Sequence, residues 1–510
     1  MQSNTQEKPN SIRCFFKKIH DLFWVSFPFV LAAVFALVLT KASFPNSDTF
    51  FIIATGEHIV ENGVVPTVNP FVIHEGFGTI VQQWLFDVLI YQIYSFGGNV
   101  GLYLYSAAVL LVSLFMMYKF FGLYSKNVPM KLLVLSFCAI LASFFVVARP
   151  TSLSFLMCLS VVMVMETYRR NKKPLLLLLL PAISLLTINL HASMWPMLFV
   201  LMVPFIFPDK LPKVKELGLR KSLGVFIKEW FDKWKWALLA MLGMFLVGLI
   251  NPNGINGMGY VFLSYGSATS ANFIAELQAP TLTTFIGILV VISILLCFKY
   301  IDKFRSKMDF AKFYMAAGTI ILAATHNRNL WFLFFGTIPL FFVFFDKFTW
   351  KIKSKDKTTG VYAILDACYL CIILALCTLP ITYGSLEIVD SGSSPVEAVA
   401  YLDDLDDASK DEVVLFTEFN NGAYMQLNDY KVYIDARPEL FQKNVNGKED
   451  IYTEYLMVRT GVMDFEEFFN KYNFTHLLVD DGTPLSGFLK AYDGCKLAVD
   501  GDGYCLYEFN

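Results

Sequence analysis

The stretch TSLSFLMCLSVVMVMETYRRNKKPLLLLLLPAISLLTINLHASMWPMLFVLMVPFIF, residues 151–207, decides the fold class. It holds three apolar runs, separated by the basic turn RRNKK at 169–173 and by His191. A helix needs roughly 20 mostly apolar residues to cross the hydrocarbon core of a bilayer, and slightly shorter runs serve where helices shield their ends. The stretch therefore predicts three successive membrane spans joined by very short turns.

Similar runs occur along most of the chain. Of its 510 residues, 56% are hydrophobic and 50 are Phe, which is more than an average soluble protein carries. The same test predicts an α-helical multi-pass membrane protein with about eleven transmembrane helices. They lie near 22–41, 99–121, 131–148, 151–168, 174–190, 192–207, 236–251, 283–299, 310–325, 330–346 and 361–383. The first run is too long for a typical signal-peptide core, so we expect it to be retained.

Lysines and arginines predict the orientation of these spans, because positive charge resists translocation and concentrates on cytoplasmic loops. With the N-terminus (1–21) in the cytoplasm, every basic cluster falls on the cytoplasmic side. These clusters lie at 169–173, 210–228, 299–307 and 347–357. The same alternation places outside the first loop (42–98), the turns at Arg149, His191 and His326, the loop 252–282 and everything after 384.

The C-terminal part differs from the rest in charge. Residues 385–510 hold 9 Lys and Arg against 25 Asp and Glu, whereas the formal net charge of the whole chain is only −2. We therefore expect three parts: a cytoplasmic N-terminus (1–21), a transmembrane domain (22–384) that includes the first outer loop (42–98), and an acidic extracytoplasmic domain (385–510).

This acidic tail alternates short strand-like runs with helical runs, which predicts a small α/β domain. The strand-like runs are 413–417, 432–434, 476–479, 497–499 and 504–509, and the helical runs are 396–405, 450–458, 464–472 and 485–492. No glycine-rich phosphate loop follows a strand, so we assign the tail no nucleotide, and we expect no nucleic acid among its partners. Cys495 and Cys505 flank a turn and could pair if the tail is exported.

The first outer loop offers a candidate catalytic base. Asp48 follows the first predicted span and begins a helix expected up to about Asn62, in which an apolar stripe lies opposite His58. Such a helix would lie along the membrane surface. A carboxylate at Asp48 could take a proton from an acceptor hydroxyl or amine that attacks an activated sugar. The alternative is a simple helix N-cap, a position that Asp fills well.

Two arginines break the charge rule that predicts the topology. Arg149 and Arg328 both lie at predicted outer span ends, where positive charge is uncommon. Arginine grips a phosphate through two parallel hydrogen bonds, so the pair favours a phosphate-bearing lipid substrate. The alternative is a side chain that extends from a helix end toward water.

Other outer polar residues could line a substrate site. These are His58, Asn189, His191, Glu276 and His326. Their side chains could bind sugar hydroxyls or, together with Asp48, a divalent cation. The spacing matches no metal motif, so the sequence leaves metal use undecided. Histidines at a membrane interface are more often structural polar residues than ligands.

The tail carries one further group of charges, Asp435-Ala436-Arg437-Pro438-Glu439, directly after a predicted strand. We interpret it as a local ion pair on a soluble surface, which contributes little to stability and is common.

Several of these short motifs resemble the GT-C class of bacterial polytopic membrane glycosyltransferases that use polyprenyl-phosphate sugars. The resemblance rests on Asp48, Thr55-Gly56-Glu57-His58-Ile59, Gly63-Val64-Val65-Pro66, Asn69-Pro70-Phe71, Gln83-Trp84-Leu85-Phe86-Asp87, Gly97-Gly98, Ala148-Arg149-Pro150, Asn189-Leu190-His191, Asn251-Pro252-Asn253-Gly254, Glu276 and Ile434 to Leu440. It covers nearly the whole chain. Gln83 stands where an acidic residue is common in such proteins, and no acidic pair adjoins Asp48.

The resemblance implies a GT-C-like enzyme of the cell membrane and cell envelope. It would transfer a sugar, with inversion, from a polyprenyl-phosphate carrier to an extracytoplasmic glycan, lipid or protein. Asp48 would be the catalytic base, and we assign Arg149 and Arg328 to the lipid phosphate. We assign Asn189, His191, Glu276, His326 and His58 to substrate binding.

Two other classes of protein fit the same residues. A non-catalytic translocator of lipid-linked saccharides needs the outer arginines but no base. An assembly subunit would work through its acidic tail, with the membrane motifs serving structure alone.

Overall fold

The computed structural model describes residues 26–27, 29–37, 47–143, 146–207, 219–264, 275–305, 307–347, 394–406, 409–410 and 412–509. The chain divides into two compact units. The first comprises residues 1–44, 103–147 and 337–385, and the second comprises residues 45–102, 148–336 and 386–510. The predicted span 361–383 lies outside the described residues, and the predicted span 22–41 is described as helical only at 26–27 and 29–37.

The described part of the first unit is helical. Its named elements are α4 (Val128–Ser143) and parts of α3 (Trp84–Gly122) and α14 (Leu333–Phe345). The rings of Phe121 and Phe342 pack with centroids 5.3 Å apart. Asn127 Nδ2 donates a hydrogen bond to the carbonyl of Asp346 at 2.8 Å. These contacts join two segments of the unit that lie more than 200 residues apart.

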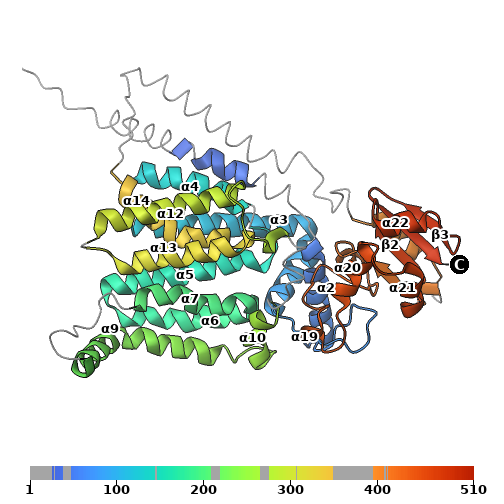
Figure 1. Ribbon diagram of the computed structural model, residues 1–510, viewed down its shortest axis with the longest axis horizontal. Coiled ribbons are helices and arrows are strands. Elements are labelled where there is room, and N and C mark those ends of the chain that lie inside the picture. The colour runs from blue at the N-terminus through green and yellow to red at the C-terminus, as the bar shows by residue number, and fades with distance from the viewer. Residues whose placement is uncertain are drawn as a thin grey trace, which may run out of the picture. The chain divides into compact units, whose positions relative to one another are not determined.

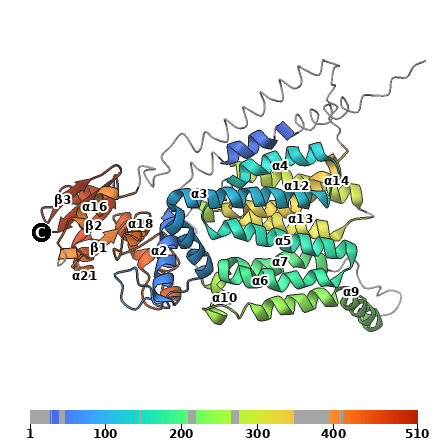
Figure 2. The same ribbon diagram turned by 180° about the vertical axis from the view of Figure 1, so that it is seen from behind.

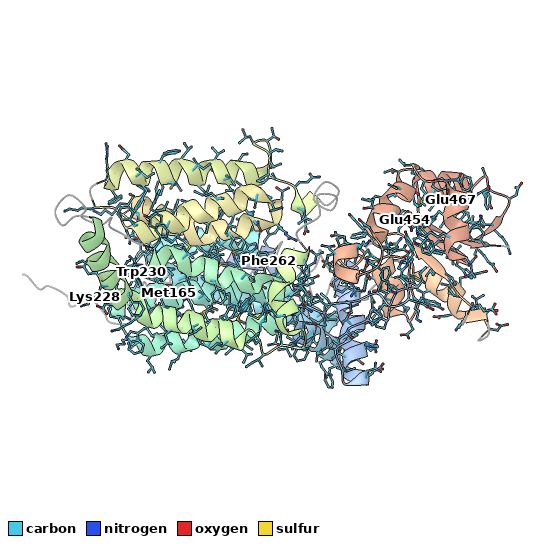
Figure 3. All side chains as sticks on the ribbon, turned by 60° about the horizontal axis from the view of Figure 1, so that its bottom comes forward. Met165, Lys228, Trp230, Phe262, Glu454 and Glu467 are labelled. Atoms are coloured by element: carbon cyan, nitrogen blue, oxygen red, sulfur yellow. The ribbon has the colours of Figure 1, made fainter. Side chains whose placement is uncertain are left out.

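The second unit contains most of the remaining apolar helices. They are α5 (Pro150–Asn171), η1 (Pro174–Leu178) leading into α6 (Leu179–Leu190), η2 (Ala192–Met194) leading into α7 (Trp195–Ile206), α9 (Leu219–Val247), α10 (Gly254–Ser264), η3 (Ala275–Leu277), α12 (Phe285–Phe304), α13 (Phe310–Thr325) and η4 (Asn327–Phe332). In both ribbon views α5, α6, α7 and α13 run side by side along one direction (Figures 1 and 2). Met165 of α5 is fully buried among them, and Trp230 of α9 donates to the carbonyl of Ile206 at 2.6 Å (Figure 3).

These helices indicate a multi-pass membrane protein. Four of them are long and apolar enough to cross a membrane, namely Trp84–Gly122, Pro150–Asn171, Phe285–Phe304 and Asn327–Phe345. Shorter apolar helices occupy Val128–Ala142, Pro174–Leu190, Ala192–Ile206 and Phe310–Thr325, where spans are predicted. Large apolar side chains such as Leu295 and Phe298 are more than 60% exposed on α12, as expected of a lipid-facing surface. The orientation of the spans stays a prediction.

The first outer loop begins with α2 (Ser47–Asn62), which confirms the predicted helix. In Figures 1 and 2 α2 runs crosswise to α5, α6 and α7. Its Gly56 lies against α3, because a Cβ on Gly56 would stand 2.2 Å from the carbonyl oxygen of Asp87. Gly98 marks a kink within α3, where it adopts φ 52° and ψ −143°, a conformation that requires glycine.

The tail contains a small mixed sheet with helices, and its separation as a domain of its own stays a prediction. Its strands are β1 (Leu415–Thr417), β2 (His476–Asp480), β3 (Cys495–Asp500) and β4 (Tyr504–Phe509), and its helices are α16 (Val396–Asp403), α18 (Gly422–Leu427), α19 (Lys443–Asn446), α20 (Ile451–Arg459), α21 (Phe465–Tyr472) and α22 (Pro484–Leu489). The sheet order is β1-β2-β4-β3. β1 and β2 are parallel, whereas β4 runs antiparallel to both β2 and β3.

Two apolar clusters cover the two faces of this sheet. One contains side chains from α20, α21 and α22, and the other contains side chains from α16 and α18. The burial pattern of β2 reflects this arrangement, since His476, Leu477, Leu478 and Val479 are all buried. A strand that is covered on both faces is expected to lack alternation of polar and apolar residues.

The predicted strand at 432–434 is present only as an isolated bridge. Val432 pairs in parallel with Leu415 on one side and with Val72 of the first outer loop on the other. The amide of Ile73 donates to the carbonyl of Val432, and the amide of Val432 donates to the carbonyl of Phe71, both at 3.0 Å. The first outer loop therefore extends the edge of the tail sheet.

Cys495 and Cys505, for which the sequence left a disulfide open, are free cysteines in the structure. In the β3–β4 hairpin Cys495 lies opposite Phe509, and Cys505 lies opposite Asp500. The two cysteines are thus about four residues apart along the hairpin, or about 13 Å. A disulfide needs Cα atoms within about 7 Å.

Candidate functional site

Asp48 lies in the first turn of α2 and forms an ion pair with Arg149. The Asp48 Oδ2 and Arg149 Nε atoms are 2.9 Å apart. The two side chains are 29% and 28% exposed, so the pair is neither sealed in the core nor fully solvated. The structure thus brings together the predicted base and one of the two predicted phosphate-binding residues.

Arg149 is positioned by the start of α5. It is the N-cap residue of that helix in an extended conformation, and Pro150 follows at the first helical position. Its carbonyl accepts hydrogen bonds from the amide and the hydroxyl of Ser152, at 3.1 Å and 2.7 Å. This geometry fixes the backbone of Arg149, so its guanidinium is presented from a rigid helix end.

A second carboxylate approaches the same guanidinium. Arg149 Nη1 lies 3.6 Å from Glu276 Oε1, and the Glu276 side chain in η3 is 64% exposed. Arg149 therefore bridges two acidic residues from separate segments of the chain.

The surroundings of Asp48 raise its pKa above the ordinary value for an aspartate. Burial is the largest cause, and the nearby charges of Glu276 and Asp435 act in the same direction. Arg149 and Arg437 oppose this effect because they favour the ionised carboxylate. A carboxylate with a raised pKa is a stronger base than a solvated one, which suits proton abstraction.

Arg328 lies in η4, next to the segment that carries Glu276. The amide of Asn327 donates to the carbonyl of Gln278 at 2.8 Å, and η3 and η4 pack together. His326 precedes η4, and its Nδ1 lies 3.0 Å from the hydroxyl of Thr325. The structure therefore places the turns of both predicted phosphate-binding arginines beside the Glu276 segment.

His191 is buried in the turn between α6 and α7. Its Nδ1 lies 2.6 Å from the hydroxyl of Ser154 on α5. Burial, together with the charge of Arg328, lowers the pKa of His191 to about 3. The imidazole is thus neutral at ordinary pH and can act as a hydrogen-bonding group rather than as a cation.

Asn189 is engaged inside the protein. Its Nδ2 donates to the carbonyls of Leu185 and Ile250, both at 2.9 Å, and its Oδ1 accepts from the indole of Trp84 at 2.8 Å. These bonds tie α6 to α3 and to the turn after α9. The side-chain amide of Asn189 is therefore used in contacts between these segments.

His58 lies near the other end of α2 from Asp48. Ten residues of α-helix separate the two residues by about 15 Å. His58 Nδ1 lies 3.3 Å from the amide of Asn62, and its ring meets the edge of Phe71. The structure does not bring His58 next to the predicted base.

The tail motif at 435–439 is a part of the site that the sequence interpretation missed. Asp435 is fully buried, and Arg437 is 12% exposed, so the prediction of a surface ion pair is wrong. Arg437 Nη2 and Nε donate to the two oxygens of Asp435, at 2.6 Å and 3.0 Å. The sequence feature that could have indicated burial of this pair is its position directly after an apolar strand-like run.

No group of three or more His, Cys, Asp and Glu side chains in the described part of the chain is arranged to hold a metal ion. Metal use therefore stays open.

Comparisons with known proteins show a likeness in fold. No protein-family model matches the chain, and no curated protein matches it. The structure is similar to that of the Archaeoglobus fulgidus oligosaccharyltransferase in its apo form, with a TM-score of 0.53 and 12% identity over 90% of this chain and 70% of that chain. A second structure of that enzyme, tethered through a disulfide bond to an acceptor peptide containing the NVT sequon, matches with a TM-score of 0.51 and 12% identity over 90% and 69% of the two chains. The fold of this chain is therefore similar to that of this oligosaccharyltransferase.

Proposed function

We propose that this protein is a membrane glycosyltransferase that moves a sugar from a polyprenyl-phosphate carrier to an extracytoplasmic acceptor. The acceptor is a cell-surface glycan, a lipid or a protein. In this proposal the N-terminus faces the cytoplasm, and the Asp48 site and the tail face outward. The similar fold of an oligosaccharyltransferase supports the reaction class.

The single observation that carries the proposal is the position of Asp48 beside Arg149. The proposed base and the proposed phosphate-binding cation form an ion pair at 2.9 Å, and each side chain is less than one-third exposed. Glycosyl transfer from a phosphate carrier needs both groups, because the acceptor must lose a proton and the leaving phosphate must gain stabilisation.

The proposed step is a single displacement. Asp48 takes the proton of the acceptor O–H or N–H group as that atom's lone pair forms a bond to the anomeric carbon. The bond from this carbon to the carrier oxygen breaks, and its electron pair leaves on the phosphate. Arg149 and Arg328 stabilise the charge of the released phosphate. One displacement inverts the configuration at the anomeric carbon.

Donor binding must first loosen the ion pair. In the structure Arg149 is held by Asp48 and Glu276. A lipid phosphate carries a stronger and more compact set of acceptor oxygens than one carboxylate, so it competes well for the guanidinium. Release of Arg149 then leaves Asp48 free to accept a proton.

A non-catalytic translocator of lipid-linked saccharide is the second candidate, and the same ion pair favours it. Asp48 would then serve only to hold Arg149 ready for the phosphate. This function needs the outer arginines but makes no use of a base.

Purified protein in proteoliposomes separates the two functions. Wild type and Asp48→Ala receive a mixture of polyprenyl-phosphate sugars and of acceptors, and both released sugar and transbilayer movement of the carrier are measured. Glu61→Gln is a matched control, since Glu61 is an exposed acid on the same helix. Transfer by wild type and Glu61→Gln but not by Asp48→Ala supports the transferase. Movement without transfer, unchanged in Asp48→Ala, supports the translocator.

A further inference from the structure

Asp435 and Arg437 form a buried ion pair with several hydrogen bonds. Besides the two side-chain bonds, the amide of Arg437 donates to Asp435 Oδ1 at 2.9 Å. Gln426 of α18 donates to Asp435 Oδ2 at 2.7 Å, and its own oxygen lies 3.4 Å from Arg437 Nη2. Every oxygen of the buried carboxylate is thus occupied, and the guanidinium is held in one plane.

This pair touches the helix that carries Asp48. The guanidinium of Arg437 lies over the ring of Phe51, 4.7 Å from its centroid. Phe51 is three residues after Asp48, so the two side chains occupy neighbouring positions on α2. A cation over an aromatic ring is attracted to the ring face, and the attraction is larger where water is excluded.

The helix α18 links the two contacts. Its Gln426 holds Asp435, and the ring of its Tyr424 meets the edge of Phe50, with centroids 5.1 Å apart. The start of α18 is packed tightly, because a Cβ on Gly422 would stand 2.0 Å from the carbonyl oxygen of Ile434. The first turn of α2 is therefore held by the tail at two consecutive residues, Phe50 and Phe51.

A buried ion pair is weak evidence for stability, because the cost of removing two charges from water offsets most of their attraction. A role in the site gives a reason for its retention. The charges that act on Asp48 come from two parts of the chain: Arg149 and Glu276 lie among the apolar helices, and Asp435 and Arg437 lie in the tail.

We propose that the tail completes the site, and that Arg437, held by Asp435 and Gln426 against Phe51, is a positioning residue for the Asp48 carboxylate. The inference rests on the proposed role of Asp48 as a base. It assigns the tail a direct part in the chemistry.

Because Asp435 and Arg437 carry opposite charges, the inference predicts opposite changes in the pH dependence of the rate when each is removed. A purely structural role of the pair would not predict this. Loss of Arg437 removes a positive charge near Asp48, so the acidic limb of the rate profile moves to higher pH. Loss of Asp435 removes a negative charge and leaves Arg437 unneutralised, so the limb moves to lower pH. Each shift is expected to be roughly half a pH unit to one pH unit.

The experiment measures sugar transfer by the full-length protein in detergent micelles as a function of pH. The variants are Arg437→Gln, Arg437→Lys and Asp435→Asn. Lys490→Gln is the control, because Lys490 pairs with Asp481 on an exposed part of the tail. Opposite shifts for Arg437→Gln and Asp435→Asn are expected, with Arg437→Lys close to wild type in pH dependence and Lys490→Gln unshifted. Reduced rates with no shift in either variant would overturn the inference.

A second readout does not depend on turnover. The carboxylate bands of Asp48 are isolated as the infrared difference between each protein and its Asp48→Asn counterpart, and they are followed through a pH titration. Opposite shifts of the midpoint in the two variants support the inference even if no donor is turned over. Equal midpoints in wild type, Arg437→Gln and Asp435→Asn contradict it, whatever the activity.

Discussion

The Nε2 atom of His74 lies 2.8 Å from the carbonyl oxygen of Tyr433, which makes a hydrogen bond between residues 359 positions apart in the chain. The imidazole stacks on Phe77 with ring centroids 4.7 Å apart and meets the edges of Tyr433 and Tyr472. Val72 and Phe77 belong to the same apolar cluster as α20–α22. The first outer loop and the tail thus share one core.

This buried histidine predicts a loss of stability in acid. Burial lowers the pKa of His74 to about 4 from 6.5. Between pH 6.5 and pH 4 this histidine is protonated in the unfolded chain but not in the folded protein, so the free energy of unfolding decreases as the pH falls. The total decrease is about 3 kcal/mol. Hydrogen exchange of residues 69–81 in full-length protein, measured from pH 4 to 7, follows this loss.

His74→Phe removes the titrating group and should flatten that acid dependence. It also leaves the Tyr433 carbonyl without its donor, at a cost of about 1–3 kcal/mol at neutral pH. His58→Phe, a change at a less buried histidine, is the control and should keep the wild-type acid limb. If His74→Phe loses stability at acid pH to the same extent as wild type, another group causes that loss.

Glu418 predicts the opposite pH dependence. It follows β1 and is fully buried, and its Oε2 accepts hydrogen bonds from Tyr455 at 2.5 Å and from Arg459 at 3.1 Å. Burial raises the pKa of Glu418 to about 7 from 4.5, against the effect of Tyr455 and Arg459. The folded protein keeps a proton that the unfolded chain loses, so stability falls as pH rises from 4.5 to 7.

Complete ionisation of Glu418 is expected to lower the free energy of unfolding by about 3 kcal/mol. Hydrogen exchange of β1 and β2 in full-length protein measures it, and Glu418→Gln should abolish the dependence because an amide does not titrate. Because the titration of His74 opposes that of Glu418 in this range, the test is made in the His74→Phe background. Tail stability that stays level between pH 4.5 and 7 in that variant would refute the assignment.

The contact between α2 and α3 predicts the effect of a single methyl group. In Gly56→Ala the new Cβ would stand 2.2 Å from the Asp87 carbonyl oxygen and 2.7 Å from Tyr91 Cβ, so the helices must separate. Overpacking of this kind costs about 1–3 kcal/mol. The melting temperature in detergent should fall. Gly318→Ala, where no atom lies within 4 Å of the added Cβ, should melt at or above the wild-type temperature. Equal melting temperatures of Gly56→Ala and Gly318→Ala would contradict the close contact between α2 and α3 at Gly56.

Arg149 is expected to act on the donor. Arg149→Gln removes the cation that the lipid phosphate would meet, and charged hydrogen bonds contribute about 1.5–3 kcal/mol, so kcat/KM for the donor should fall roughly 10- to 100-fold. Arg149→Lys should recover part of the loss, because lysine keeps the charge but not the forked geometry. Arg305→Gln removes a positive charge after α12 and is the control. Equal kcat/KM in Arg149→Gln and Arg305→Gln would exclude Arg149 from donor binding.

Local patterns predicted the local structure well. The apolar run at 151–168 is α5, and the basic turn after it ends that helix at Asn171. Gly98 marks the kink in α3 because few other residues adopt its backbone conformation. Most helical and strand-like runs of the tail appear within a few residues of their predicted bounds. Periodicity and turn residues act over a few positions, and a single sequence displays them directly.

Contacts across the chain could not be predicted in the same way. Asp48 and Arg149 were both selected, but nothing in the sequence states that they lie 2.9 Å apart. The bridge between Val72 and Val432 and the burial of Asp435 depend on how distant segments pack. A charged triplet in an acidic tail resembles a solvated surface until its neighbours are known. Burial of charge is set by those neighbours, which local composition does not encode.

The role of Asp48 as the base is the central claim, and single-turnover sugar transfer by Asp48→Asn at saturating donor tests it most directly. Donor binding is measured separately, so that a loss in chemistry is distinguished from a loss in affinity. The account predicts a rate constant about 100- to 10,000-fold below wild type, with donor affinity changed only a few-fold. A rate constant equal to that of wild type would contradict it.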